Sequence, residues 1–236
     1  MIPFSDLARA AYCPRQCYYA RREDDRDLPE SVRKRRALAF RYPELVDAPD
    51  SELRRLPIER SPAAYRRNLA RLRERDDFDR LADPARKHAF VAGRDCHGVV
   101  HKVMAPGDDA VDGGKPPAES ESEQPPPPVP VVVSPGEPPK NGVWEPQSVR
   151  AVATAKALAW EHEREVPHAL VEYPTVGTVR EVGLTTRKKA AYRKAVRTVR
   201  SIDGPPSRVA DSRCEPCEYR DRCGTRRRSL KSLLTG

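Results

Sequence analysis

The spacing of apolar residues divides the chain into helical and extended parts. Helices are expected from Ser5, which can cap a first turn, and from Pro14 to about Arg21. Residues 22–60 have helical spacing only in patches, because four prolines interrupt it. A longer helix is expected from Pro62 to about Ala82, so the first third of the chain is predicted to be mainly helical.

The period of the pattern changes in the middle of the chain. Phe90–Gly93, Gly98–Met104 and Val129–Val133 are apolar runs of the kind that form strands. Residues 105–128, between the second and third run, are acidic and rich in glycine and proline, a composition that cannot bury a core. We expect a disordered or polyproline-like insertion between two neighbouring strands, where extra loop length costs little stability.

The remaining pattern predicts a helix, a strand pair and a closing helix. The first helix begins at Gln147 or Ser148 and ends near Glu163, and the strands are Ala169–Tyr173 and Val179–Leu184. Thr185 or Thr186 caps a basic amphipathic helix that ends near Ile202. Strands around a central helix, with helices at both ends, predict an α/β (α+β) domain.

The 236 residues are enough for one sizeable domain. We expect four parts. Residues 1–104 form an N-terminal helical region that leads into the core, and residues 105–128 are the insertion. Residues 129–203 form the rest of the core, and residues 204–236 are a C-terminal segment with a cysteine cluster and a basic tail. No apolar run is long enough to span a membrane, and the N-terminus lacks the apolar core of a signal peptide. We therefore expect a cytoplasmic protein.

The charge is strongly positive and unevenly distributed. The net charge is +9, but residues 105–128 contribute −5, so the rest of the chain carries +14. An excess of this size favours a polyanionic partner, above all nucleic acid. Arginine-rich helices with one solvated face would also account for the charge, so charge alone leaves both interpretations open.

Four cysteines suggest a metal centre. Cys214, Cys217 and Cys223 have the spacing Cys-x2-Cys-x5-Cys, and Cys13 lies at a helix–Cys-Pro–helix junction near the start of the chain. In a reducing compartment such thiols are metal ligands more often than disulfides, and four thiolates suit an iron–sulfur cluster or structural zinc. Cys17, one helical turn after Cys13, is either a spare ligand or a small buried apolar residue.

The same residues resemble a known family. Phe4–Leu7 and Tyr12–Tyr19 resemble the N-terminal signature of the CRISPR-associated exonucleases of the Cas-four type, which are RecB-like nucleases of the PD-(D/E)xK superfamily. Ala157–Glu161, Val171–Pro174 and the C-terminal cysteine cluster follow in the order of that family. The resemblance implies a restriction-endonuclease-like core, in which a mixed sheet is flanked by helices and a four-cysteine site joins the two ends of the chain.

The resemblance also implies a cofactor and partners. Cys13, Cys214, Cys217 and Cys223 would hold a [4Fe–4S] cluster, with structural zinc as the alternative. The partners would be DNA and proteins of CRISPR adaptation. Basic residues near the cluster and on the last helix, together with the tail Arg226–Arg228, are candidate phosphate contacts. The candidates outside the tail are Arg15, Arg187, Lys188, Lys189, Arg193 and Lys194.

The catalytic motifs of that family are not matched. Such nucleases hold Mg²⁺ or Mn²⁺ with an Asp on one strand and a Glu-x-Lys on the next, usually with a Gln on the following helix. The alignment puts four other residues at the Asp, Glu, Lys and Gln positions: His101, Val132, Ser134 and Val152. We therefore expect DNA cleavage to be weak or absent.

Two other hypotheses remain at this point. The first is an active exonuclease whose ligands have moved, with Asp95, Glu145 and Gln147 beside His101 as weak candidates and Mg²⁺ or Mn²⁺ as its metal. The second is a zinc-containing adaptor whose basic faces bind an acidic protein. Ser134 lacks the Gly-x-Ser-x-Gly context of a nucleophile, and the sequence contains no phosphate-binding glycine loop of the Walker or dinucleotide type.

Overall fold

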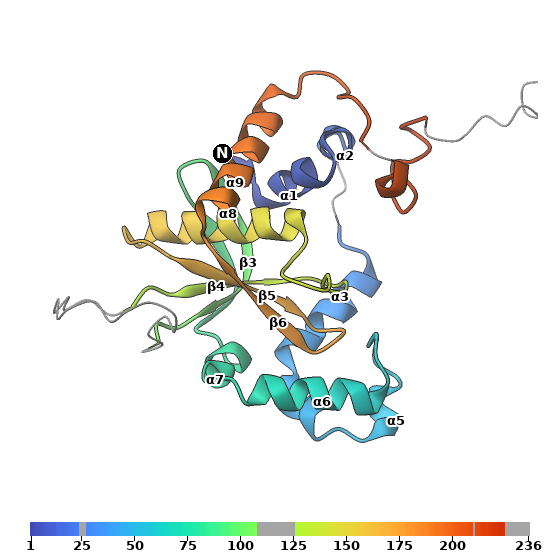
Figure 1. Cartoon of the computed structure of the whole chain (residues 1–236), viewed down its shortest axis with the longest axis vertical. Coiled ribbons are helices and arrows are strands. Elements are labelled where there is room, and N and C mark those ends of the chain that lie inside the picture. The colour runs from blue at the N-terminus through green and yellow to red at the C-terminus, as the bar shows by residue number, and fades with distance from the viewer. Residues whose placement is uncertain (24–26, 108–125, 210, 225–236) are drawn as a thin grey trace, which may run out of the picture.

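The computed structural model describes residues 1–23, 27–107, 126–209 and 211–224 (Figure 1). Most of the acidic insertion and the tail Arg226–Arg228 lie outside these residues. The disorder expected for the insertion and the phosphate contacts expected of the tail therefore remain predictions. Among the described residues, no helix is both long enough and apolar enough to cross a membrane.

A six-stranded mixed sheet forms the centre of the fold. The strands run in the order β1-β3-β4-β5-β6, and β2 pairs with β3. Pairs β1–β3 and β4–β5 are parallel and the other pairs are antiparallel. The strands are β1 Ile2–Pro3, β2 Arg86–Ala92, β3 Cys96–Met104, β4 Val129–Val133, β5 His168–Tyr173 and β6 Thr178–Gly183. The α/β class and the pairing of the two strands that flank the insertion are thus confirmed.

One side of β3 is incompletely paired. There β1 pairs with Cys96 and His97, and β4 pairs only with residues 102–104. Residues 98–101 of β3 have no strand partner on that side in the described part of the chain, although β2 covers their other side. We call this stretch, residues 98–101, the β3 gap.

Helices cover both faces of the sheet (Figure 1). One layer contains α1, α2, α8 and α9, and the other contains α3 to α7. The helices are α1 Phe4–Tyr12, α2 Pro14–Ala20, α3 Glu30–Ala37, α4 Tyr42–Val46, α5 Asp50–Leu53, α6 Pro62–Arg73, α7 Phe78–Ala82, α8 Glu145–Glu161 and α9 Thr186–Ser201. Two short 3-10 turns, η1 Leu38–Phe40 and η2 Asp211–Arg213, complete the elements.

Each helical layer has its own apolar core. Leu7, Val152 and Val171 belong to the core under α1, α8 and α9, while Leu69 and Val131 belong to the core above α4 to α7. The small residues of α8 allow it to lie very close to the sheet. A Cβ added to Gly93 would lie 2.6 Å from Cα of Ala157, so only glycine fits where β2 ends beneath α8.

A buried ion pair connects the sheet to the second layer. Lys102 on β3 and Glu172 on β5 have no exposed side-chain surface, and their charged atoms are 2.8 Å apart. Lys102 Nζ also donates hydrogen bonds to the carbonyl oxygens of Ala39 at 2.6 Å and Leu81 at 2.8 Å. Burial raises the pKa of Glu172 to about 7 against the opposing effect of Lys102. All three donors of the ammonium group are used, which makes its burial possible.

Most predicted element boundaries agree with the structure. Ser61 and Thr185 cap α6 and α9 by accepting hydrogen bonds from the backbone amides of Ala64 and Lys188, each at 3.4 Å. α8 begins at Glu145, two residues before the predicted start, with Pro146 in its first turn.

The predicted helix from Pro62 to Ala82 is wrong at its end. α6 stops at Arg73, and α7 starts only at Phe78. The residues between them are all charged, and the guanidinium of Arg75 donates to both oxygens of Asp77, at 2.7 and 2.6 Å. Aspartate favours such local bonds over a helix interior, so the chain turns here and starts a new helix.

Candidate functional site

The four cysteines of the predicted metal site lie around one small cavity. Cys13 is the extended residue between α1 and α2, and its side chain lines the cavity. Cys214, Cys217 and Cys223 line the same cavity from the C-terminal segment, about 200 positions later in the chain. Tyr12, Tyr19 and Tyr219 complete much of the wall. The sequence prediction that these four residues come together therefore agrees with the geometry.

Tight turns position the three C-terminal thiols. The amide of Cys217 donates to the carbonyl of Cys214 at 3.2 Å, and the amide of Cys223 donates to Tyr219 at 2.8 Å. Reciprocal bonds link this segment to α1, since Tyr12 Oη donates to Arg213 O at 3.0 Å and the Arg213 guanidinium donates to Tyr12 O at 2.6 Å. The rings of Tyr19 and Tyr219 stack at 5.8 Å, so hydrogen bonds and ring stacking hold the segment against the N-terminal helices.

The donor set fits a thiolate centre, although the sulfurs are not arranged as a closed one. All six cysteines are free of disulfides. Burial, followed by the charges of nearby groups that include Cys13 and Cys214, raises the pKa of Cys217. Within the described residues no three His, Cys, Asp or Glu side chains form a closed metal-binding group. The four thiols thus have the donor chemistry of a cluster or zinc site, and their sulfurs would have to move closer together to bind one group.

The other two cysteines lie elsewhere. Cys17 is buried on α2, and its Sγ donates to the carbonyl of Asp6 at 3.5 Å. Cys96 is buried at the start of β3, with its Sγ 3.4 Å from Tyr192 Oη. Neither residue lines the four-cysteine cavity, so Cys17 corresponds to the interpretation as a buried apolar residue.

A second polar site lies at the β3 gap, where the nuclease alignment puts its catalytic positions. His101 is buried there, and its Nδ1 accepts a hydrogen bond from the backbone amide of Val133 at 3.0 Å. Directly after β4, Ser134 Oγ accepts from Gln147 Nε2 at 2.7 Å. Gln147 also accepts from Tyr173 Oη and from the amide of Trp144. His101 and Ser134 therefore lie near each other, but their polar side-chain atoms are occupied by the amide of Val133 and the side chain of Gln147.

Val152, the residue aligned with the catalytic Gln, lies in the apolar core and contributes no polar group. Gln147, one and a half turns earlier on α8, supplies the only side-chain amide hydrogen-bonded to Ser134 in the described structure. The amide of this site is thus contributed by a different helix position from the one that the alignment indicated.

The electrostatics around His101 do not suit a divalent cation. Burial lowers the pKa of His101 well below its usual range, and the charges of Arg150, Arg36, His88 and Lys102 lower it further. Burial and the charges of Arg36 and Arg9 also lower the pKa of Arg150 to about 10. Hard dications need several oxygen ligands, usually carboxylates, whereas the charged groups that act on His101 are all basic.

The structure does not bring the alternative ligand set together. Asp95 lies in the turn before β3, where it pairs with Arg200 at 2.7 Å and lines a hollow beside the C-terminal end of α8. Glu145 lies at the other end of α8 and lines a hollow with Arg187 and Lys188. The ends of this 17-residue helix are roughly 25 Å apart. Asp95, Glu145 and Gln147 therefore cannot ligate one metal ion in this fold.

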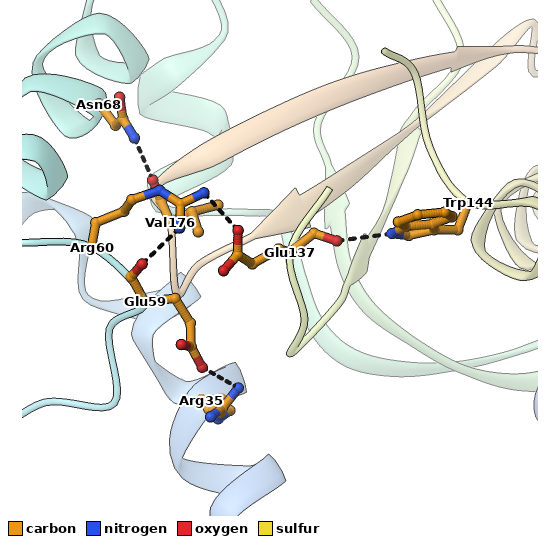
Figure 2. A network of polar contacts seen from close by, with 7 residues as sticks. All are labelled: Arg35, Glu59, Arg60, Asn68, Glu137, Trp144 and Val176. Carbon is orange, nitrogen blue, oxygen red and sulfur yellow. Dashed lines mark hydrogen bonds and ion pairs between the residues drawn. The ribbon is translucent and has the colours of Figure 1, made fainter. Parts of the chain in front are cut away.

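Polar contacts fix the loop beside His101 to the second helical layer (Figure 2). Glu137 of this loop pairs with Arg60 at 2.6 Å, and its carbonyl accepts from Trp144 Nε1 at 2.9 Å. Arg35 on α3 pairs with Glu59 at 2.6 Å and donates to the carbonyl of Pro135 at 3.4 Å. The start of the loop between β4 and α8 is thus held against α3 and the segment before α6, and Trp144 at its end is hydrogen-bonded back to Glu137.

The predicted DNA contacts fall into two groups. Arg15 donates to the carbonyl of Pro206 at 3.1 Å and lies over the Tyr19 ring, so its contacts are with the C-terminal segment. The other five lie on α9, where Arg187, Arg193 and Lys194 are exposed. Lys188 and Lys189 are half-buried, and Lys189 pairs with Glu165 at 3.2 Å. α9 therefore presents a basic surface that can reach a phosphate backbone.

Neither a scan against protein-family models nor a search of curated proteins finds a match for this chain. Function must therefore be argued from the two sites and from the charge of the surface.

Proposed function

We propose that this protein binds DNA through a RecB-type nuclease fold that has lost hydrolytic activity and carries a [4Fe–4S] cluster on its four converging cysteines. The proposal rests mainly on one observation: Cys13 and the Cys-x2-Cys-x5-Cys cluster, from opposite ends of the chain, line one cavity. This is the arrangement that the N-terminal signature and the C-terminal spacing imply together. The biological role implied by the resemblance is DNA end processing or assistance in CRISPR adaptation.

The topology supports the nuclease-fold part of the proposal. A nuclease of this superfamily needs its Asp on one strand and its Glu-x-Lys on the next. The aligned residues His101 and Val132 lie on β3 and β4, which are adjacent and antiparallel. α8 follows β4 and packs over the sheet, as the helix that carries the family's Gln would.

Loss of hydrolysis follows from the chemistry of the same site. Val132 is buried and apolar, and Ser134 is hydrogen-bonded to Gln147. The charged side chains that act on His101 are all basic, and basic groups repel a divalent cation. Without a bound dication, neither the attacking water nor the developing charge on the phosphate is stabilised.

The cysteine centre has a structural role in this proposal. A cluster bound by Cys13, Cys214, Cys217 and Cys223 would cross-link the C-terminal segment to α1 and α2. The segment contains few other apolar anchors, since Tyr219 is its only buried large side chain among the described residues after α9. The cluster would thereby keep the basic groups near both ends of the chain in one arrangement.

DNA binding itself is tested by its dependence on salt. Fluorescence anisotropy with a labelled duplex should give a logarithmic affinity that falls linearly with the logarithm of salt concentration. The variant R193Q/K194Q removes two exposed charges from α9 and should reduce that slope by about 1.8. The variant R71Q/R73Q removes two exposed charges from α6, in the other helical layer, and serves as the charge-matched control.

Hydrolysis is measured on the same complexes with Mg²⁺ or Mn²⁺ present. The proposal expects intact oligonucleotides, single- or double-stranded, under conditions in which they are bound. A wild-type protein that does not bind DNA at low salt would refute the DNA-binding part. Metal-dependent release of nucleotides would refute the loss of activity and restore the exonuclease hypothesis.

A further inference from the structure

We propose that the β3 gap is a phosphate-binding pocket, in which the guanidinium groups of Arg36 and Arg150 bind one phosphate of a DNA strand without a metal ion. The inference rests on the proposed DNA-binding function. It names phosphate as the chemical group that is recognised at the position where the nuclease alignment puts its catalytic residues. In this account two fixed cations stand where an active nuclease holds a dication.

Arg150 extends from α8 to the gap in the sheet. Its terminal nitrogen Nη2 lies 3.4 Å from the carbonyl oxygen of Val99, on the stretch of β3 that has no strand partner on that side. Its Nε is buried and has no hydrogen-bond partner. Within the described residues no carboxylate lies within ion-pair distance of Arg150, so its charge and one of its donors are unsatisfied.

Arg36 lies on α3, and its charge acts on both His101 and Arg150. Its neighbour Arg35 already has partners, because its Nη1 pairs with Glu59 and donates to the carbonyl of Pro135. Arg36 itself makes no ion pair within the described part of the chain, and its Nε is buried without a partner. Arg35 therefore fixes the end of α3, and Arg36 is the guanidinium that this end contributes to the pocket.

The two arginines lie near enough to affect each other. The charge of Arg36 contributes to lowering the pKa of Arg150 to about 10, and both charges lower the pKa of His101. Arginine remains protonated at neutral pH even so, and two half-buried like charges repel. An anion between them would remove this repulsion and satisfy the open donors, because guanidinium groups bind phosphate oxygens through several hydrogen bonds.

His101 adds a third hydrogen-bond donor, because the tautomer of its imidazole ring is fixed. Its Nδ1 accepts the amide of Val133, and its lowered pKa keeps the ring neutral. The single ring proton must then lie on Nε2. A neutral imidazole N–H with two guanidinium groups recognises a phosphate, but it offers no ligand set for Mg²⁺ and no base for activating water. Binding without cleavage is the expected result.

The test compares R36Q and R150Q with R33Q, each of which removes one arginine charge. Arg33 is exposed on α3, one turn before Arg36, and makes no ion pair in the described structure. Binding of a labelled oligonucleotide is measured in EDTA by anisotropy. R36Q and R150Q should each weaken binding roughly tenfold or more and reduce the salt slope by about 0.9, whereas R33Q should change affinity less than about threefold.

A second measurement does not depend on DNA. Inorganic phosphate at constant ionic strength should raise the melting temperature of the wild type and of R33Q, as a ligand of the native state does. It should not raise that of R36Q or R150Q. Adding Mg²⁺ should leave oligonucleotide affinity unchanged or lower it. If R150Q does not fold, R36Q, whose side chain lies at the end of a short helix, provides the same two measurements.

The outcomes separate the inference from the proposed function. If the wild type binds DNA and both pocket variants bind as R33Q does, the pocket inference is wrong while DNA binding stands. If the wild type binds no DNA, the proposed function fails, and the phosphate measurement still decides whether the pocket holds an anion. Stabilisation by phosphate that persists in R36Q and R150Q would overturn the inference.

Discussion

Replacing Lys102 by methionine should be among the most destabilising single changes in this protein. The substitution keeps the length and most of the volume of the side chain but removes its charge and all three hydrogen bonds. Glu172 and the carbonyl groups of Ala39 and Leu81 then lose their partner in a site that has no exposed surface at Lys102 or Glu172. Oε2 of Glu172 already has no partner.

The expected cost is about 3–5 kcal/mol, the usual effect of removing one partner of a buried ion pair. This is a large part of the roughly 5–15 kcal/mol that stabilises a typical domain. For a chain of this size it corresponds to a fall in melting temperature of roughly 6–20 °C. Chemical denaturation and thermal melting, each followed by circular dichroism, measure both quantities.

The dependence on pH identifies the cause. Burial already raises the pKa of Glu172 to about 7 in the presence of Lys102, and removing the cation raises it further. A carboxyl group whose folded pKa is raised contributes stability below its unfolded pKa, and this contribution is lost as the pH rises toward the folded value. K102M should therefore be closest to the wild type near pH 4–5 and most destabilised at pH 7 and above.

Two further variants complete the experiment. K102M/E172L replaces the pair by apolar groups and should be more stable than K102M, because no buried charge is left alone. K87M makes the same substitution at an exposed pair, in which Lys87 lies 3.1 Å from Asp83, and should cost less than about 1 kcal/mol. The reasoning is refuted if K102M costs no more than K87M, or if the double variant is the least stable of the set.

Two other predictions concern the cysteine cavity and the contact between α8 and the sheet. C13S should lose most of the bound metal while C17S keeps it, because only Cys13 of the two lines the cavity. Metal analysis of both purified proteins tests this prediction. Equal metal content in the two variants would contradict it. G93A should destabilise the fold by about 1–3 kcal/mol, since its Cβ would lie 2.6 Å from the backbone of Ala157, whereas the control G204A meets no atom within 4 Å. Thermal melting of both variants tests the contact, and equal melting temperatures would show that α8 can move away from β2.

The helices and strands that depend on a local sequence pattern were predictable from the sequence. Apolar periodicity identified β3, β4 and α9 closely, because each has its own period and its own capping or turn residues. The convergence of Cys13 with Cys214 was predictable because the resemblance includes both ends of the chain. The break between α6 and α7 was missed, since it depends on competition between charged side chains and the helix backbone.

The polar interior was less predictable. Lys102 lies in a strand pattern where a lysine normally points to solvent, and its burial requires a carboxylate from β5 and carbonyls from two other segments. The burial of Arg36 and Arg150 was likewise not predictable, since the neighbouring Arg33 of α3 is exposed. One signal was available for Arg150, namely a single arginine within the alanine-rich stretch of α8. Which partners meet these side chains is decided only by tertiary packing.

The central claim is that the two ends of the chain bind one iron–sulfur cluster. It is tested most directly by the visible absorption spectrum of anaerobically purified protein, with iron, sulfide and zinc assayed on the same sample. The account predicts a broad band near ~400 nm that bleaches on reduction, with about four irons per chain. A colourless protein containing one zinc would contradict the cluster while leaving a four-cysteine site, and a protein without either metal would contradict both.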